Sequence, residues 1–452
     1  MTSELRDLAR FIAGLRYEDI PPDVLDTVSG CVLDSVSAAL GAVNDPQVGR
    51  VSKLYLEIAG DKPAASVWGQ GKKAPLLTAV FLNAMMGHTL ELDDVHTNSK
   101  THIGIVVIPA VWGLAESLGK SGKDLLLAVL CGYETMARIG MAFGVSSHRN
   151  LGWHVTATAG TFGAAAACAK LLDLSEDQIV SALGLAGTQS FGSWAFLGDS
   201  ASNKVLHPAR AATSGCESAL LAQAGMTGAQ SILTASDGGL LAMMSDEHDV
   251  SRVNAGLGEI WEIRYMDNKP YPCCRSTHCT IDSALALRNE QGVQAEDIER
   301  VEVRTYLVGN KQCGMSEGSR RPKTAIDAKF STPYTVASAF LRGNVTGDDF
   351  TPEAIAAEDV QALLRRVEVV TDERFTQAYP EHWGCELIAT LKDGRQLSAT
   401  TTDASGSVLN PLSAEQLKRK ATALLRAAKS NQAEAVAASL LDIRGAALLP
   451  AL

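Results

Sequence analysis

The spacing of apolar residues changes once along the chain, and this change limits the folds that the sequence can adopt. Over about the first 250 residues, apolar side chains recur at helical spacing, as Leu5, Leu8 and Ile12 do. Alternation of apolar and polar residues is nearly absent there. It begins only after Trp261, for example in residues 298–306. The sequence therefore predicts a helical region followed by a unit that mixes strands and helices.

Local signals place individual helices and strands. A capping-box pattern at Ser121-x-x-Asp124 opens an apolar periodic run, and Ser175 begins a second one. Asp393-Gly394 is typical of a hairpin turn between two alternating segments. Helices are expected at about 123–143, 155–172, 176–190, 205–224, 279–290, 331–342 and 352–365, and strands at 298–306, 367–371, 386–391 and 396–402.

The chain returns to a helical pattern near its end. Ser413-x-x-Gln416 forms a capping box, and the helix behind it has an apolar face that needs a partner. We therefore expect the C-terminal helices to pack on the N-terminal helical region. The sequence predicts a mainly α fold with two domains: an all-helical domain of residues 1–265 and 410–452, and a smaller α+β domain of residues 266–409.

Charge and hydropathy exclude several classes of protein. The net charge is −11, and no run of Lys or Arg forms a basic stripe, which argues against binding to nucleic acid or to an anionic membrane surface. No apolar signal segment follows the N-terminus. The most apolar stretches, residues 125–133 and 155–169, are shorter than the roughly 18–20 residues of a membrane span. We expect a cytoplasmic protein with no nucleic acid and no membrane as partner.

The motifs that hold metals and nucleotides are missing. Nine cysteines are scattered along the chain, and Cys273-Cys274 and Cys279 have no CxxC pair as partner. There is no HExxH motif and no GxGxxG motif after a strand, and the segment 113–121 has one residue too many for a P-loop. We expect free thiols, no metal site and no cofactor.

A polar cluster lies between two apolar, helix-like segments. Residues 87–104 contain three histidines and three carboxylates, and they are flanked by the segments 74–86 and 106–118. Polar groups between segments that favour burial are costly unless they are paired or used. The cluster therefore indicates acid–base chemistry on a charged small molecule. A solvated loop between two helices is the alternative interpretation.

Further cationic and ionisable groups recur downstream, at places where helices are expected to begin. A helix N-terminus favours anions, and Lys, Arg and His add positive charge to it. Each of these groups taken alone also fits a capping residue or a solvated basic turn. The candidates are Asp93, Thr97 and His102 in the first cluster, His154 in the second, Lys204 and His207 in the third, Lys269, Arg275 and His278 in the fourth, and Ser331 and Tyr334 in a fifth.

These residue types suit proton abstraction next to a carboxylate. The proton on the carbon beside a carboxylate is very weakly acidic, so its removal needs a positioned base and groups that hold the resulting dianion. His and Lys can serve as base and acid, and Lys, Arg and helix N-termini can hold the charge. No metal is required if enough donors converge.

The same segments resemble the MmgE/PrpD family, which includes 2-methylcitrate dehydratase, cis-aconitate decarboxylase and iminodisuccinate epimerase. The similar segments run in family order over most of the chain. The resemblance implies a large all-helical domain joined to a smaller α+β lid domain, in a homodimer, with a cofactor-free active site between the domains. The segments are 67–71, 83–94, 101–104, 153–160, 204–210, 269–278 and 328–334.

The resemblance to the decarboxylase branch also implies a set of catalytic residues. Carried over by motif, this set is Asp93, Thr97, His102, His154, Lys204, His278 and Tyr334, with His207, Arg275, Lys269 and Ser331 as substrate-binding residues. The chain departs from the common family pattern at Glu91 and Val95, which replace an Asp and a Thr, and at Ile103 and Val155, which replace prolines next to two histidines. These changes keep the ionisable groups but alter the pocket wall.

Three interpretations follow. The leading one is a cofactor-independent lyase acting on a small di- or tricarboxylate, of the 2-methylcitrate dehydratase or cis-aconitate decarboxylase type. The second is an epimerase of a dicarboxylate such as iminodisuccinate, which shares the first proton transfer and returns the proton to the opposite face. The third is a non-catalytic scaffold, which has no reason to keep so many ionisable groups at these positions. The sequence does not distinguish the first two, because both need two proton-transfer groups beside one carbon.

Overall fold

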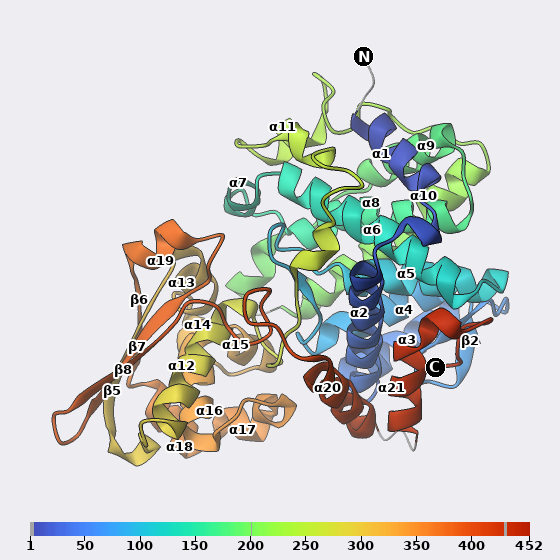
Figure 1. Ribbon diagram of the computed structural model, residues 1–452. Helices are drawn as coiled ribbons and strands as arrows, with labels where there is room; N and C mark the ends of the chain where they lie inside the picture. Colours follow the sequence, from blue (N-terminus) through green and yellow to red (C-terminus); the bar gives the residue numbers. More distant parts are fainter. Residues whose placement is uncertain (1–3, 200, 429–431) are drawn as a thin grey trace. The chain divides into compact units, whose positions relative to one another are not determined.

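The computed structural model describes residues 4–199, 201–428 and 432–452, which form two compact units (Figure 1). The first unit comprises Met1–Trp194, Asn203–Asn268 and Ser413–Leu452, and the second comprises Ala195–Ser202 and Lys269–Leu412. Each of the two boundaries between the units lies three residues further along the chain than the sequence predicted. The segment 195–202 also belongs to the second unit, contrary to expectation, because the buried Phe196 ring contacts the Phe330 ring at 6.4 Å.

Helices build most of the first unit. The expected capping boxes at Ser121 and Ser175 are both present at the helix starts. The fold is mainly α, as predicted. The helices are α1 (Glu4–Gly14), α2 (Pro22–Gly41), α3 (Pro46–Ile58), α4 (Leu76–Thr89), α5 (Gly104–Leu118), α6 (Gly122–Ala142), α7 (Val145–Asn150), α8 (Val155–Leu171), α9 (Glu176–Gly187), α10 (Leu206–Gln223), α11 (Leu240–Met244), α20 (Ala414–Ala427) and α21 (Ala433–Leu441).

Helix α8 lies at the centre of this unit and packs against α5, α6, α9 and α10. Its sequence is mostly Ala, Gly and Thr, and nearly all of its residues are buried. Small residues let the helices approach closely. A Cβ atom added at Gly215 of α10 would lie 2.5 Å from the Thr161 carbonyl oxygen of α8. This close packing holds the middle turns of α8 and α10 together.

Two small sheets correct the expectation of an all-helical domain. Strands β1 (Ala65–Val67) and β2 (Lys72–Ala74) form one antiparallel pair, and β3 (Val95–His96) and β4 (Met266–Asp267) form the other. Each strand is only two or three residues long, so periodicity could not reveal it. The second pair joins the polar segment after α4 to a part of the chain about 170 residues later.

The C-terminal helices pack back on the first unit, as predicted. The side chain of Leu424 in α20 lies against Gly41 of α2. The Lys420 ammonium, also in α20, donates to a carboxylate oxygen of Asp34 at 2.6 Å and to the Leu92 carbonyl oxygen at 2.7 Å. The chain end is therefore attached beside the polar segment.

The second unit combines helices with a four-stranded sheet in the order β6-β5-β7-β8. Strand β5 (Ile298–Thr305) is parallel to β6 (Val367–Thr371) and antiparallel to β7 (Cys385–Leu391), which pairs with β8 (Gln396–Thr401). Helix α12 packs on β7 and β8, and α16 packs on α12. The helices are α12 (His278–Asn289), α13 (Leu307–Cys313), α14 (Glu317–Arg320), α15 (Ala325–Lys329), α16 (Thr332–Arg342), α17 (Pro352–Ala356), α18 (Glu358–Leu364) and α19 (Glu373–Ala378).

The sequence placed the strands of this sheet well and one helix less well. The alternation in β5 is real, because Val301 and Val303 are buried and face Ala389 and Leu387 of β7. The single helix expected at 352–365 is two short helices, α17 and α18. The chain breaks between them at Ala357, whose φ of −58° and ψ of 130° are not helical.

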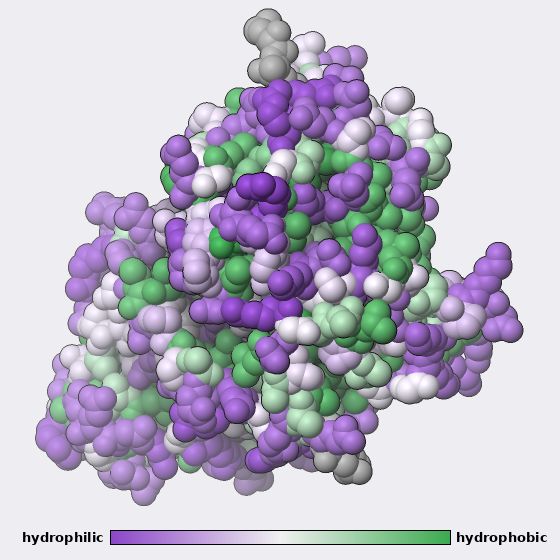
Figure 2. Space-filling view, turned by 45° about the vertical axis from the view of Figure 1, so that its right-hand side comes forward, coloured by the Kyte–Doolittle hydropathy of each residue, from purple (hydrophilic) through white to green (hydrophobic). Residues whose placement is uncertain are grey.

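Two helices of the first unit have the length and hydropathy of a membrane span, contrary to the estimate from the sequence. They are Pro22–Gly41 and Gly122–Ala142. Of the most apolar stretch of each helix, 78% and 89% respectively is buried inside the protein. Such burial is typical of core helices. The face drawn in Figure 2 carries mainly hydrophilic side chains, with apolar residues between them.

A glycine exchange tests the close packing of α8 and α10. We expect Gly215→Ala to lower the free energy of unfolding by roughly 1–3 kcal/mol, because the added methyl group overlaps the α8 backbone. The matched control is Gly14→Ala in α1, where a Cβ meets nothing within 4 Å. Urea unfolding followed by circular dichroism measures both. Equal midpoints for the two variants would contradict this account of the packing.

Candidate functional site

The polar segment after α4 is buried rather than solvated, so the solvated-loop alternative is wrong. His88, Asp93 and Asp94 have no exposed surface, and Glu91 and His102 are 5% and 9% exposed. The apolar helices α4 and α5 bring the two ends of the segment into the core. The chain leaves α4 through Glu91, whose φ of 57° lies in the left-handed region that few non-glycine residues adopt. Buried polar groups of this kind must find partners within the protein.

Asp93 is the partner shared by two histidines. Its carboxylate lies 3.0 Å from Nδ1 of His88 and 2.7 Å from Nδ1 of His102. Burial by itself raises the pKa of Asp93, but the charges and hydrogen bonds of His88 and His102 outweigh it and hold the pKa well below its ordinary value. Asp93 is therefore an anion that holds Nδ1 of both rings.

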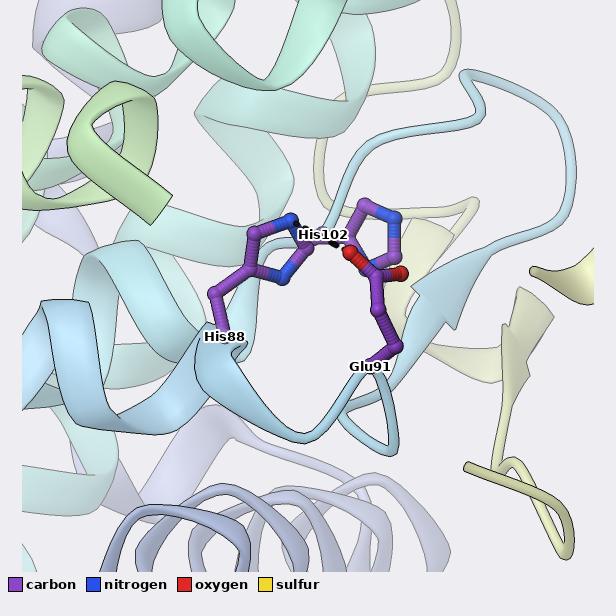
Figure 3. Close-up of side chains that lie close together, drawn as sticks. All are labelled: His88, Glu91 and His102. Carbon is purple, nitrogen blue, oxygen red and sulfur yellow. Dashed lines mark ion pairs between the residues drawn. The ribbon is translucent and has the colours of Figure 1, made fainter. Parts of the chain in front are cut away.

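Glu91 forms a second set of contacts on the other side of His88. Its carboxylate lies 3.5 Å from Nε2 of His88 and accepts a hydrogen bond from the ammonium of Lys204. In Figure 3 the His88 and His102 rings converge on this carboxylate. The contacts therefore run from Lys204 through Glu91, His88 and Asp93 to His102.

His154 and His207 form a pair of their own. His154 precedes the first residue of α8, His207 lies in the first turn of α10, and their Nδ1 atoms are 2.8 Å apart. Burial lowers the pKa of His154 well below its usual value, and the charges of His207 and Lys204 lower it further. Burial, His88 and Lys204 lower the pKa of His207 to about 4. Both rings are therefore neutral near pH 7, and one nitrogen of the pair donates while the other accepts.

The two sets of contacts belong to one cluster. The charges of His88 and His102 also act on His154, as does that of Lys204. The first unit therefore brings together five of the residues predicted from the sequence, which come from separate segments. They are Asp93, His102, His154, Lys204 and His207.

Neighbouring groups hold the polar segment in place. Asp94 accepts hydrogen bonds from the Tyr133 hydroxyl at 2.7 Å and from the Gly104 amide at 3.0 Å, where α5 begins. Burial, followed by the charge of Asp34, raises the pKa of Asp94 to about 7. Thr97, predicted to be catalytic, donates its hydroxyl hydrogen to Asp267 at 2.7 Å. This bond fastens the segment to β4.

The other predicted residues lie in the second unit, and their roles stay predictions. Ser331 caps α16 by accepting a hydrogen bond from the Tyr334 amide. The Tyr334 hydroxyl donates to the Asp349 carbonyl oxygen, and burial raises its pKa to about 12. His278 is buried at the first position of α12. Lys269 and Arg275 are also buried, and the Arg275 guanidinium lies 5.8 Å from the centre of the Trp383 ring.

The site selection from the sequence omitted His88 and Glu91. His88 lies in the polar segment already recognised, but no motif set it apart from His96. The structure distinguishes them, because His96 bonds Ser99 and the Glu262 carbonyl oxygen while His88 faces Asp93 and Glu91. Glu91 departs from the common family pattern, and this departure was the one sequence feature that could have identified it as a site residue.

The cluster has the groups needed for proton transfer at an anionic substrate. Neutral histidines can accept a proton near pH 7, and the Lys204 ammonium can attract a carboxylate. His88, Glu91 and His102 also offer a set of metal-ligating atoms within 4.8 Å of one another. The arrangement supports acid–base chemistry in a site that is mostly shielded from water.

Two protein-family models together match most of the chain. The MmgE/PrpD N-terminal domain matches residues 6–252, and the MmgE/PrpD C-terminal domain matches residues 271–443. The chain is 29% identical to cis-aconitate decarboxylase of Aspergillus terreus, over 82% of this chain and 79% of that protein. It is 28% identical to cis-aconitate decarboxylase of Homo sapiens, over 93% and 87%. It is 23% identical to 2-methylcitrate dehydratase of Cupriavidus necator, over 84% and 81%.

The neutral state of the histidine pair can be measured directly. We expect the imidazoles of His154 and His207 to take up no proton between pH 8 and pH 5.5, because burial and nearby cations lower both pKa values. Nitrogen-15 NMR of the histidine rings follows this, with His154→Gln and His207→Gln to assign the signals. Unfolded histidines titrate near pH 6.5, so the pair's contribution to the free energy of unfolding should fall as the pH drops below about 6.5. A pair that titrates near pH 6.5 in the folded protein would contradict the burial argument.

Proposed function

Because this chain belongs to the MmgE/PrpD family, we propose that it is a lyase that transfers a proton at a carbon next to a carboxylate of a small di- or tricarboxylate. The observation that carries the proposal is the buried cluster of Asp93, His102, His154, Lys204 and His207 in the first unit. It combines neutral bases, a cation and a fixed carboxylate. In this proposal the reaction needs no cofactor, and the active protein is a homodimer.

Within the lyase class, we favour decarboxylation of a cis-aconitate-type substrate over dehydration of a methylcitrate-type substrate. The support is that the decarboxylase relatives match at higher identity than the dehydratase of similar coverage. Dehydration remains the alternative within the lyase class.

Lys204 binds a substrate carboxylate in this mechanism. Its ammonium is held by Glu91, so it is already positioned when an anion arrives. A charge-assisted hydrogen bond to the substrate is stronger in a buried site than in water. The substrate carboxylate then shares or replaces Glu91 as the partner of the ammonium.

His154 is the proton-transfer group in this mechanism. Its Nδ1 is held by His207, which leaves Nε2 to exchange a proton with the substrate. Decarboxylation adds a proton to the substrate carbon chain as carbon dioxide leaves, so in the assigned reaction His154 passes a proton from water to the substrate. In the dehydration alternative the ring, which is neutral because its pKa is low, instead accepts the proton that the substrate loses. Asp93 orients His102 as a second proton-transfer group, since the carboxylate fixes Nδ1. The roles of Lys269, Arg275, His278, Ser331, Tyr334 and Thr97 stay predictions.

A substrate screen tests the reaction class. Cis-aconitate, citrate, 2-methylcitrate and iminodisuccinate are incubated with the protein in deuterated water and followed by NMR. We expect loss of carbon dioxide from cis-aconitate, with deuterium incorporated into the product. Loss of water from 2-methylcitrate would favour the dehydratase type. Inversion of iminodisuccinate without either loss would show an epimerase, and no exchange with any substrate would favour a scaffold.

Variants of two cluster residues test the mechanism. We expect His154→Ala and Lys204→Ala each to lower turnover by roughly 10²–10⁴-fold, the usual scale of general acid–base catalysis, without unfolding the protein. The matched control is His248→Ala, because His248 is exposed and bonds only its local Ser245 carbonyl oxygen in the described contacts. Turnover and deuterium exchange are measured on the substrate found in the screen. Near-normal rates in both cluster variants would show that the active site is elsewhere.

A further inference from the structure

We propose that His88, Glu91 and His102 form a binding site for a divalent transition-metal ion such as Zn²⁺, and that an ion bound there inhibits the enzyme. The binding part stands on the geometry of the first unit alone. The inhibition part rests on the proposed function, because it requires this cluster to be the active site.

The donor set and its spacing are those of a zinc site. Two histidines and a carboxylate are a common set of protein ligands for Zn²⁺, with a fourth position left for water or substrate. One ligand atom from each of the three residues lies within 4.8 Å of the other two. Ligands at about 2.0–2.2 Å from a tetrahedral ion lie about 3.5 Å apart. The three side chains, drawn in Figure 3, therefore need to close by about 1 Å to ligate one ion.

Asp93 orients the two histidines of the proposed metal site. Metal-binding histidines commonly direct their other ring nitrogen to a carboxylate, which fixes the tautomer and the ring orientation. Asp93 contacts Nδ1 of both His88 and His102 and so fixes the orientation of both rings. Nε2 of His88 already lies 3.5 Å from a Glu91 carboxylate oxygen. A single carboxylate thus prepares both rings to ligate one ion.

Lys204 competes with the metal for Glu91. Its ammonium donates to the carboxylate oxygen that also lies nearest to His88. A metal ion bound to this oxygen would release the Lys204 ammonium. Two positive charges at bonding distance from one carboxylate oxygen repel each other strongly. The ion would thereby remove the positioned cation and occupy His102. Both effects inhibit the proposed reaction.

The proposed competition between Lys204 and the metal ion for Glu91 can be tested. Substitutions of Glu91 and of Lys204 should change the metal affinity in opposite directions. Co²⁺ is titrated into the chelator-treated full chain, and its visible absorption reports the ligands. We expect one Co²⁺ bound per chain, displaced by Zn²⁺. Glu91→Gln should weaken binding by more than about tenfold, and Asp93→Asn should weaken it by about 10–100-fold. Lys204→Met should tighten binding, because it removes the competing cation.

Controls separate this site from other metal-binding groups. His382→Asn removes a histidine that contacts Asp403 in the second unit, and it should leave Co²⁺ affinity unchanged. A thiolate charge-transfer band would assign the ion to the cysteines and overturn the proposal. Equal affinity in wild type, Glu91→Gln and Asp93→Asn would overturn it too. Circular dichroism checks that each variant is folded.

Activity measurements test inhibition separately from binding. We expect Zn²⁺ to abolish turnover at the concentration that fills the site, and a chelator to restore it. Binding that follows the variant pattern without loss of turnover would overturn the inhibition part and leave the binding site standing. Failure of the substrate screen would leave the Co²⁺ titration fully interpretable, so the two proposals fail independently.

Discussion

The site depends on one buried carboxylate, that of Asp93. Moving an ionised carboxylate out of water costs several kcal/mol unless other groups replace its hydration. Here the Nδ1 atoms of His88 and His102 do so, and they keep the pKa of Asp93 low. The same contacts orient both rings. The compensation of the buried charge and the orientation of the two rings therefore depend on the same pair of contacts.

Helices far apart in the sequence keep this carboxylate in place. Lys420 of the C-terminal helix α20 bonds the Leu92 carbonyl oxygen, immediately before Asp93, and also pairs with the buried Asp34 of α2. Asp94, on the other side of Asp93, bonds Tyr133 of α6 and the first amide of α5. The backbone around Asp93 is thus held on both sides. The C-terminal helix α20 therefore contacts the first unit through Lys420 as well as through its apolar face.

The electrostatic state of the cluster suits an anionic substrate. His154 and His207 stay neutral at pH 7 because they are buried near one another and near Lys204. In the proposed reaction they could therefore take part in proton transfer without repelling Lys204, the cation proposed to attract the substrate. Glu91 neutralises Lys204 in the free protein. An incoming carboxylate or a metal ion changes that balance, which is why one cluster supports both the proposed reaction and the proposed inhibition.

The sequence alone located most of the longer helices, the strands of the larger sheet and several residues of the cluster. Helical spacing and capping boxes located α6, α8, α9 and α20, and alternation located the strands of the larger sheet, because these signals are local. Motifs named five residues of the cluster. The tertiary structure decided which residues pair. The contact of Lys204 with Glu91 spans 113 positions, and that of His154 with His207 spans 53. Such pairs form only when the helices pack, so no local pattern could select His88 and Glu91 or assign the segment 195–202 to the second unit.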